Sequence, residues 1–191
     1  MARFGLDRAE QFGGQGGGGF FKLSYGVTAH IRFLYNSISE VEGYSVHAVQ
    51  LNGKKRYVDC LRGANDDKDK CPFCKTGMYA EVKYFVPIYD EDKNCVFTWE
   101  RGKAFGKKIE SLFSDYAANE ALCATCFNVT KEKDTNGLTH ITIEPGCSDG
   151  AEVDDYLEVP LKVYGNLVLV KTAGEMEYYM EYGDFRDKNA C

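Results

Sequence analysis

One histidine and three cysteines have the spacing of a metal site. His47 is followed by Cys60 after twelve intervening residues, by Cys71 after ten more and by Cys74 after two. The C-x-x-C pair, with Pro72 inside it, is a tight knuckle that can present two thiolates to one ion. Three thiolates and one imidazole are the ligand set of a closed tetrahedral structural zinc site, so this spacing predicts one structural zinc ion.

A β-hairpin is expected to bring the first two ligands together. Asn52-Gly53 is the strongest short-range hairpin signal, and strand-like residues flank it on both sides. In that register His47 falls opposite Val58, which makes His47 and Cys60 diagonal neighbours on one face, about 7–8 Å apart at the backbone. The competing interpretation is a redox dithiol at the knuckle, with His47 and Cys60 as ordinary residues.

A second C-x-x-C pair, Cys123 and Cys126, lies at an expected helix-to-strand junction without a proline or glycine to shape a knuckle. Free cysteine packs as a small hydrophobic residue, so buried structural thiols are the favoured interpretation. The alternative is a four-cysteine site made of both C-x-x-C pairs.

The elements that must position these residues are mostly strands. The helical periodicity of apolar residues predicts one helix over 103–119. Alternation and turn signals predict strands at 27–35, 44–51, 54–60, 82–89, 95–100, 126–134, 138–144, 157–164 and 167–172. Asn136-Gly137 predicts a second hairpin turn, and Gly165-Asn166 a further turn. Many short strands with one helix predict an all-β barrel or sandwich with a helical plug.

Basic and aromatic residues alternate along several of these strands, which is typical of surfaces that bind single-stranded nucleic acid. Trp99 is expected to be exposed, because polar and charged residues surround it. The competing interpretation is that many of these aromatic residues simply form the core. The candidate DNA contacts are Arg32, Lys55, Arg56, Tyr57, Lys83, Tyr84, Trp99, Arg101, Lys103 and Lys107.

Composition and charge narrow the class of protein. The 191 residues suffice for one ordinary domain, and the net charge of −6 is uneven: residues 1–110 hold 17 basic and 14 acidic residues, and residues 111–191 hold 6 and 15. No apolar run approaches the roughly 20 residues that span a bilayer, and the amino terminus has no secretion-signal pattern. Eight cysteines without an export signal favour reduced thiols and a cytoplasmic location. No nucleotide-binding or catalytic motif is present, so we expect no enzyme.

Several of these segments together resemble one protein family. They are AHIRFLY (29–35), His47, the Asn-Gly-Lys hairpin, Cys60, CPFC (71–74) and CVFTWERGKAFGKKI (95–109). In combination they are similar to the T-even bacteriophage single-stranded DNA-binding proteins, also called helix-destabilising proteins. The resemblance implies a five-stranded OB-fold barrel with an inserted zinc subdomain and one or two helices. It also implies His47, Cys60, Cys71 and Cys74 as the zinc ligands.

The expected organisation has three parts. Residues 1–19 form a flexible glycine-rich arm, and residues 20–174 form the DNA-binding core with the zinc subdomain at about 44–80. Residues 175–191 form an acidic carboxy-terminal segment that recruits replication or recombination proteins. The expected function is sequence-nonspecific coating of single-stranded DNA during phage replication, recombination and repair, in the host cytoplasm and apart from any membrane. Two alternatives are a zinc-stabilised phage structural or adaptor protein and a thiol–disulfide enzyme.

Overall fold

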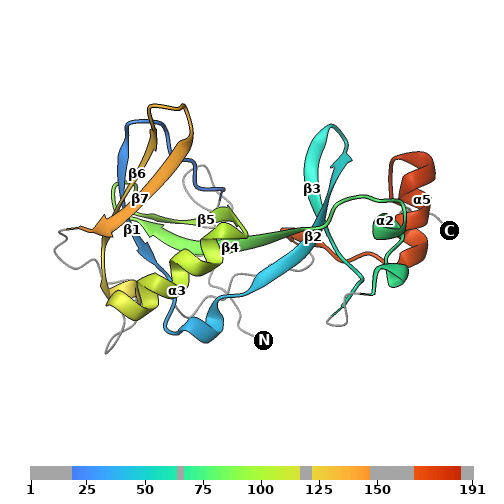
Figure 1. The fold of residues 1–191 in the computed structure, drawn as a ribbon, viewed down its shortest axis with the longest axis horizontal. Helices are drawn as coiled ribbons and strands as arrows, with labels where there is room; N and C mark the ends of the chain where they lie inside the picture. The colour runs from blue at the N-terminus through green and yellow to red at the C-terminus, as the bar shows by residue number, and fades with distance from the viewer. Residues whose placement is uncertain (1–18, 64–66, 117–121, 147–165, 186–191) are drawn as a thin grey trace. The chain divides into compact units, whose positions relative to one another are not determined.

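The structure is a computed structural model that describes residues 19–63, 67–116, 122–146 and 166–185. It is mainly β (Figure 1). The chain divides into two compact units. Unit 1 comprises Met1–Glu42 and Tyr84–Pro160, and unit 2 comprises Gly43–Lys83 and Leu161–Cys191. The expected amino-terminal arm up to residue 18 and the strand expected at 157–164 lie outside the described residues, as does half of the expected Gly165-Asn166 turn.

Unit 1 contains most of the strands. These are β1 (Thr28–Phe33), the larger part of β4 (Glu81–Asp90), β5 (Cys95–Gly102), β6 (Phe127–Lys133) and β7 (Thr139–Pro145). β1 pairs antiparallel with both β4 and β6, and β6 pairs antiparallel with β7. Each of the corresponding strand predictions is confirmed to within a few residues at its ends.

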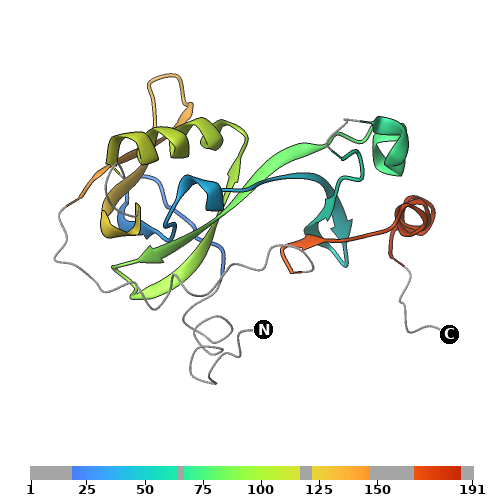
Figure 2. The ribbon, with the colours of Figure 1, turned by 90° about the horizontal axis from the view of Figure 1, so that it is seen from below.

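The predicted helix is α3 (Ala104–Tyr116), which lies along the strands of unit 1 (Figure 2). Its buried residues Phe105, Ile109 and Leu112 join the largest apolar cluster of the described residues. Their spacing of about one helical turn puts them on one face, which is why the periodicity in the sequence predicted this helix. Short 3₁₀ helices flank the sheet at η1 (Ile38–Glu40) and η3 (Leu122–Ala124).

Unit 2 is built on the predicted hairpin. Its elements are β2 (Gly43–Leu51), β3 (Lys54–Asp59), η2 (Lys68–Lys70), α2 (Pro72–Lys75), β8 (Val168–Leu169) and α5 (Ala173–Tyr182). At the hairpin turn, Asn52 and Gly53 have φ values of +52° and +73°. Positive φ at both positions matches the twist of paired strands, and asparagine and glycine tolerate it best. β8 pairs parallel with β3.

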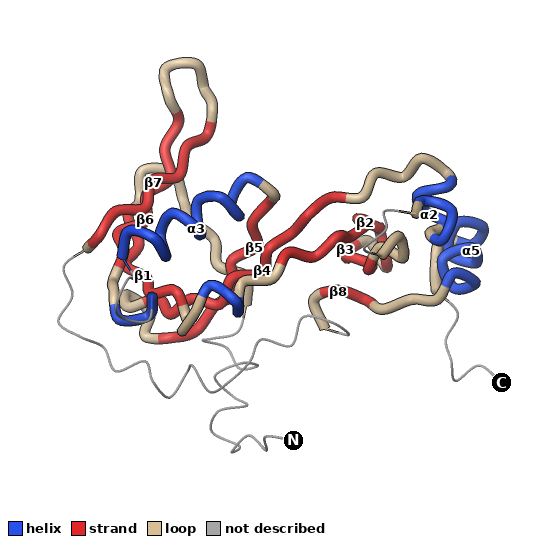
Figure 3. Tube along the Cα trace, turned by 60° about the horizontal axis from the view of Figure 1, so that its bottom comes forward, coloured by secondary structure: helices blue, strands red, loops and turns tan. Residues whose placement is uncertain are grey.

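Helix α5 was not expected, because the sequence predicted only an acidic segment over residues 175–191. The helix begins with a capping box: the Thr172 hydroxyl accepts a hydrogen bond from the Glu175 backbone, and the Glu175 side chain accepts one from the Thr172 N–H. It ends at Gly183, whose φ is +74°. Helices α2 and α5 lie side by side in unit 2 (Figure 3).

The described strands form one open sheet. Their hydrogen-bonded order is β7-β6-β1-β4-β2-β3-β8, and β5 also pairs with β4. A barrel would require the two end strands of this order to pair with each other, and the order of the described strands does not include that closure. The fold shown is therefore an open, mainly β sheet with few helices.

Candidate metal centre

Three elements of unit 2 bring the four predicted ligands together. His47 lies in β2, Cys60 directly follows β3, and Cys71 and Cys74 lie at the start of α2 and within it. His47 is opposite Val58, as the hairpin register predicted, and the Cys60 N–H donates to the Ser45 carbonyl at 2.9 Å. The expected diagonal placement of His47 and Cys60 is confirmed.

The distances between the donor atoms fit one metal ion. The His47 Nε2 atom lies 3.3 Å from the Cys71 Sγ and 3.5 Å from the Cys74 Sγ, and the Cys60 and Cys74 sulfurs are 3.6 Å apart. All four donor atoms lie within 4.8 Å of one another. Metal–sulfur and metal–nitrogen bonds of about 2.3 and 2.0 Å at tetrahedral angles place neighbouring donors roughly 3.5–3.8 Å apart. The cluster is thus a possible metal site with four protein ligands.

The groups around the donors hold them in place. The His47 side chain is fully buried, and its ring meets the Phe73 ring edge-on at 5.3 Å between centroids. The Arg62 Nε donates to the Cys60 sulfur at 3.3 Å. Backbone bonds from Lys75 to Cys71 and from Gly77 to Cys74 shape the knuckle. Such outer contacts fix the orientation of ligands and thereby favour metal binding.

The pKa values of the candidate ligands follow from their burial and from the short distances between their donor atoms. Burial lowers the pKa of His47 below its ordinary value, which keeps the imidazole neutral and able to coordinate. Burial raises the pKa of Cys60, but hydrogen bonds from Arg62 and from the Cys74 and Cys71 thiols together lower it by more, so the net shift is downward. Burial and the neighbouring Cys60 sulfur raise the pKa of Cys74 to about 12. A divalent cation would relieve this crowding because it replaces the thiol protons.

The second C-x-x-C pair belongs to unit 1. Cys123 and Cys126 are each 4% exposed, which confirms the expected burial. In the part of the chain that the structure describes, Cys71 and Cys74 share their cluster with His47 and Cys60 rather than with this pair.

Three of the candidate DNA contacts are buried: Arg32, Tyr57 and Trp99. Trp99 was expected to be exposed, and this was wrong: it is 3% exposed, because its ring packs against Phe21, Phe33 and Phe105. Arg32 is also 3% exposed. Its guanidinium pairs with Glu91 at 2.5 Å and donates to the backbone carbonyls of η3, so in this structure it links β1 to that helix.

The remaining candidates divide between the units. In unit 2, Lys55 and Lys83 lie over the ring of the buried Tyr57, at 4.9 and 5.4 Å from its centroid, and Arg56 is exposed. In unit 1, the exposed Lys103 and Lys107, the half-buried Tyr84 and the half-buried Arg101 lie on or next to β4, β5 and α3.

Sequence reasoning missed two groups of residues. Met176 and Tyr179 of α5 pack against the apolar residues beside the candidate ligands, and the centroid of the Tyr179 ring lies 5.8 Å from that of Phe73. The sequence T-x-x-E at Thr172–Glu175 is a capping-box signal that could have predicted this helix. The second group lies around Tyr25 and Lys131 in unit 1, and neither was among the candidates.

Comparison of the chain with models of known protein families and with curated proteins finds no match. Among the described residues, none of the helices has the length and apolar character needed to cross a membrane.

Proposed function

We propose that this protein binds single-stranded DNA without sequence preference and coats it during phage replication, recombination and repair. The observation that carries the proposal is the repeated placement of cations over aromatic rings on and beside the strands. Lys131 and Lys133 lie 4.2 and 5.1 Å from the centroid of the exposed Tyr25 ring, and the exposed Lys55 lies over the buried Tyr57. Cationic surfaces with aromatic rings are how proteins hold single strands, since phosphates need charge and every base has a face that can stack. The family resemblance of the sequence supports the same function.

In this proposal the metal is zinc and its role is structural. Three cysteines and one histidine are a typical zinc set, and four protein ligands leave no open position for a substrate or a water nucleophile. His47, Cys60, Cys71 and Cys74 would hold the ion, which would fix the knuckle against the hairpin. The open sheet of the described residues would be part of an OB-type barrel.

The protein would act by occupancy rather than by chemistry. Phosphates would contact the exposed lysines and arginines, bases would stack on accessible rings, and the bound strand could not pair with its complement. Helix α5 presents Glu177 and Glu181 to solvent one turn apart. This acidic face would dock basic replication or recombination proteins in the cytoplasm of the host cell.

The test is a titration of a fluorescein-labelled dT oligonucleotide with the protein, followed by fluorescence anisotropy over a range of salt concentrations. We expect saturable binding that weakens as salt rises, with weaker binding to the matching duplex. Absence of binding at low salt would refute the proposal and favour the adaptor role, in which the metal-bound protein acts only through other proteins. Metal analysis of the same sample should give one zinc ion per chain.

A further inference from the structure

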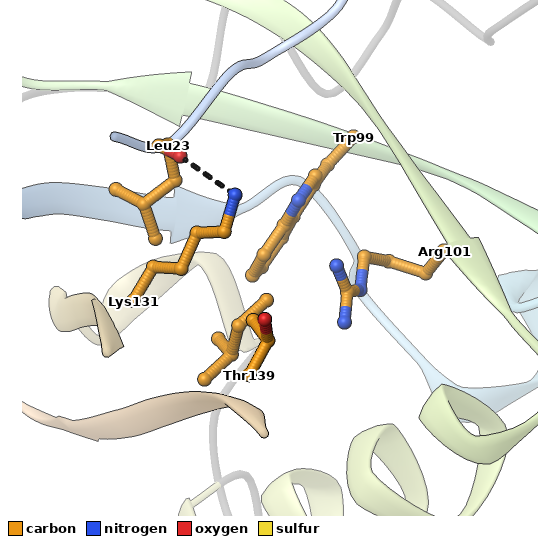
Figure 4. Close-up of a pocket in the computed structure, with 6 residues that line it drawn as sticks. Leu23, Trp99, Arg101, Lys131 and Thr139 are labelled. Atoms are coloured by element: carbon orange, nitrogen blue, oxygen red, sulfur yellow. Dashed lines mark hydrogen bonds between the residues drawn. The ribbon is translucent and has the colours of Figure 1, made fainter. Parts of the chain in front are cut away.

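A hollow of about 370 Å³ lies in unit 1 beside Trp99. Its volume is in the range of ordinary ligand sites. Figure 4 shows the Arg101 guanidinium and the Lys131 ammonium on either side of the Trp99 ring in that view. The residues that line the hollow are Leu23, Trp99, Arg101, Lys131, Thr139 and Ile141.

The charge of this hollow is positive. It is lined by two cations and by no carboxylate. The Arg101 Nε is buried and has no hydrogen-bond partner among the described residues. Burial lowers the pKa of Arg101, and the charge of the neighbouring Glu100 raises it by less. A half-buried guanidinium with a buried, unused donor is stabilised by an anion, and arginine can bind the oxygens of a phosphate with two parallel hydrogen bonds.

The other cations nearby are held in place by backbone carbonyls. Lys131 donates to the Leu23 carbonyl at 3.3 Å, and Lys108 donates to the Ile141 carbonyl at 2.7 Å. Because carbonyls carry no net charge, both ammonium groups keep their positive field. The positive charge of Arg101 also lowers the pKa of Lys108, after the larger effect of burial.

An accessible aromatic ring adjoins this hollow. Tyr25 is 49% exposed, and its hydroxyl is hydrogen-bonded to the Thr139 hydroxyl at 2.7 Å. The Gly26 N–H donates to the Lys131 carbonyl, which fixes the position of the Tyr25 segment beside β6. The ammonium groups of Lys131 and Lys133 lie 4.2 and 5.1 Å from the ring centroid. Tyr25 also lines a second, more open hollow, together with Gly26, Glu132 and Lys133.

We propose that the Arg101–Lys131 hollow receives a backbone phosphate of a single nucleic acid strand and that the adjacent base stacks on Tyr25. An isolated anion would use only the cations, whereas a nucleotide uses the cations and the ring together. The long lysine side chains can leave the ring to contact neighbouring phosphates. This inference rests on the proposed function and assigns it a site, in which Tyr25 and Lys131 are contacts not expected from the sequence.

The test uses the full chain, a short dT oligonucleotide and two readouts. Anisotropy of the labelled strand measures affinity, and the fluorescence of Trp99, the one tryptophan, reports on the hollow itself. We expect Arg101→Met to weaken binding about 10-fold or more at low salt and to reduce the salt slope by about 0.7. Tyr25→Leu should weaken binding by about 5- to 150-fold, and Tyr25→Phe should recover most of the lost affinity because it restores the ring.

Lys54→Met is the matched control. Lys54 is exposed at the hairpin of unit 2, so its replacement removes the same charge and leaves the hollow intact. Thermal unfolding of each variant checks that the fold persists, since Arg101 packs against Trp99 and Phe105.

Three outcomes are informative. Loss of affinity in the Arg101 and Tyr25→Leu variants, with Trp99 fluorescence changed by DNA in the wild-type protein, supports the site. The site is overturned, while the proposed function stands, if the wild-type protein binds and Arg101→Met and Tyr25→Leu do not change its affinity. The same conclusion follows if Lys54→Met weakens binding as much as these two substitutions do. Failure of the wild-type protein to bind overturns both.

Discussion

Removal of the metal is expected to release residues 67–80 and to leave unit 1 folded. The reason is the small apolar cluster around the ligands. Apart from the ligand cysteines, its buried members among the described residues are Val49, Val58, Phe73 and Met176. Unit 1 has a much larger cluster that contains no member of the metal site.

The magnitude follows from these residues. Four buried apolar side chains contribute about 6–12 kcal/mol, at about 1.5–3 kcal/mol each. Ordering the backbone of residues 67–80 costs about 14–28 kcal/mol, at about 1–2 kcal/mol per residue. Binding of a structural zinc ion contributes about 10–16 kcal/mol. Burial and zinc binding together then offset the cost of ordering the backbone to within a few kcal/mol. Without the ion, the cluster cannot hold this segment in place.

The assay combines a chelator with hydrogen exchange and with Trp99 fluorescence, under reducing conditions. We expect the amides of residues 67–80, which include α2, to lose protection as the metal is removed. The emission of Trp99 should stay unchanged, because this side chain is buried in unit 1.

Paired cysteine variants provide the control. Cys74→Ser should lose the metal, whereas Cys95→Ser, outside the cluster, should keep it. Protection of the α2 amides that survives chelation, or a Trp99 shift at the same chelator concentration, would refute the reasoning.

Three further predictions concern unit 1. Trp99→Ala should lower the free energy of unfolding by about 3–5 kcal/mol in urea titrations followed by circular dichroism, because it empties a buried aromatic site; a loss below about 1 kcal/mol would contradict its place in the core. Gly106→Ala should cost about 1–3 kcal/mol in thermal unfolding, since a Cβ there would overlap the Tyr84 hydroxyl; unchanged stability would mean that the ring moves freely. The hydrogen bond from His140, with backbone N–H donors, holds the pKa of Asp134 below 3.8. The ionised Asp134 carboxylate therefore stabilises the β6–β7 turn above pH 3.8, and this stabilisation is lost as the pH falls through the lowered pKa. An NMR titration of Asp134 with a midpoint at or above 3.8 would contradict this.

Local features of the fold could be predicted from the sequence with few errors. Asn52-Gly53 determines the hairpin register because both residues tolerate positive φ, and the register in turn places His47 opposite Val58. The apolar periodicity of α3 likewise identifies the face that is buried. Helix α5 was missed because its acidic composition obscured the capping box that starts at Thr172.

The sequence by itself determined the possible metal site, since its four donor residues depend on one short hairpin and one knuckle, whose geometry is set by neighbouring residues. Only the tertiary structure decided which aromatic residues are accessible. Trp99 has polar neighbours in the sequence but is covered by the Phe21, Phe33 and Phe105 rings, while Tyr25 is left exposed beside Lys131. The physical reason is that burial depends on contacts between residues far apart in the chain, and no local pattern records them.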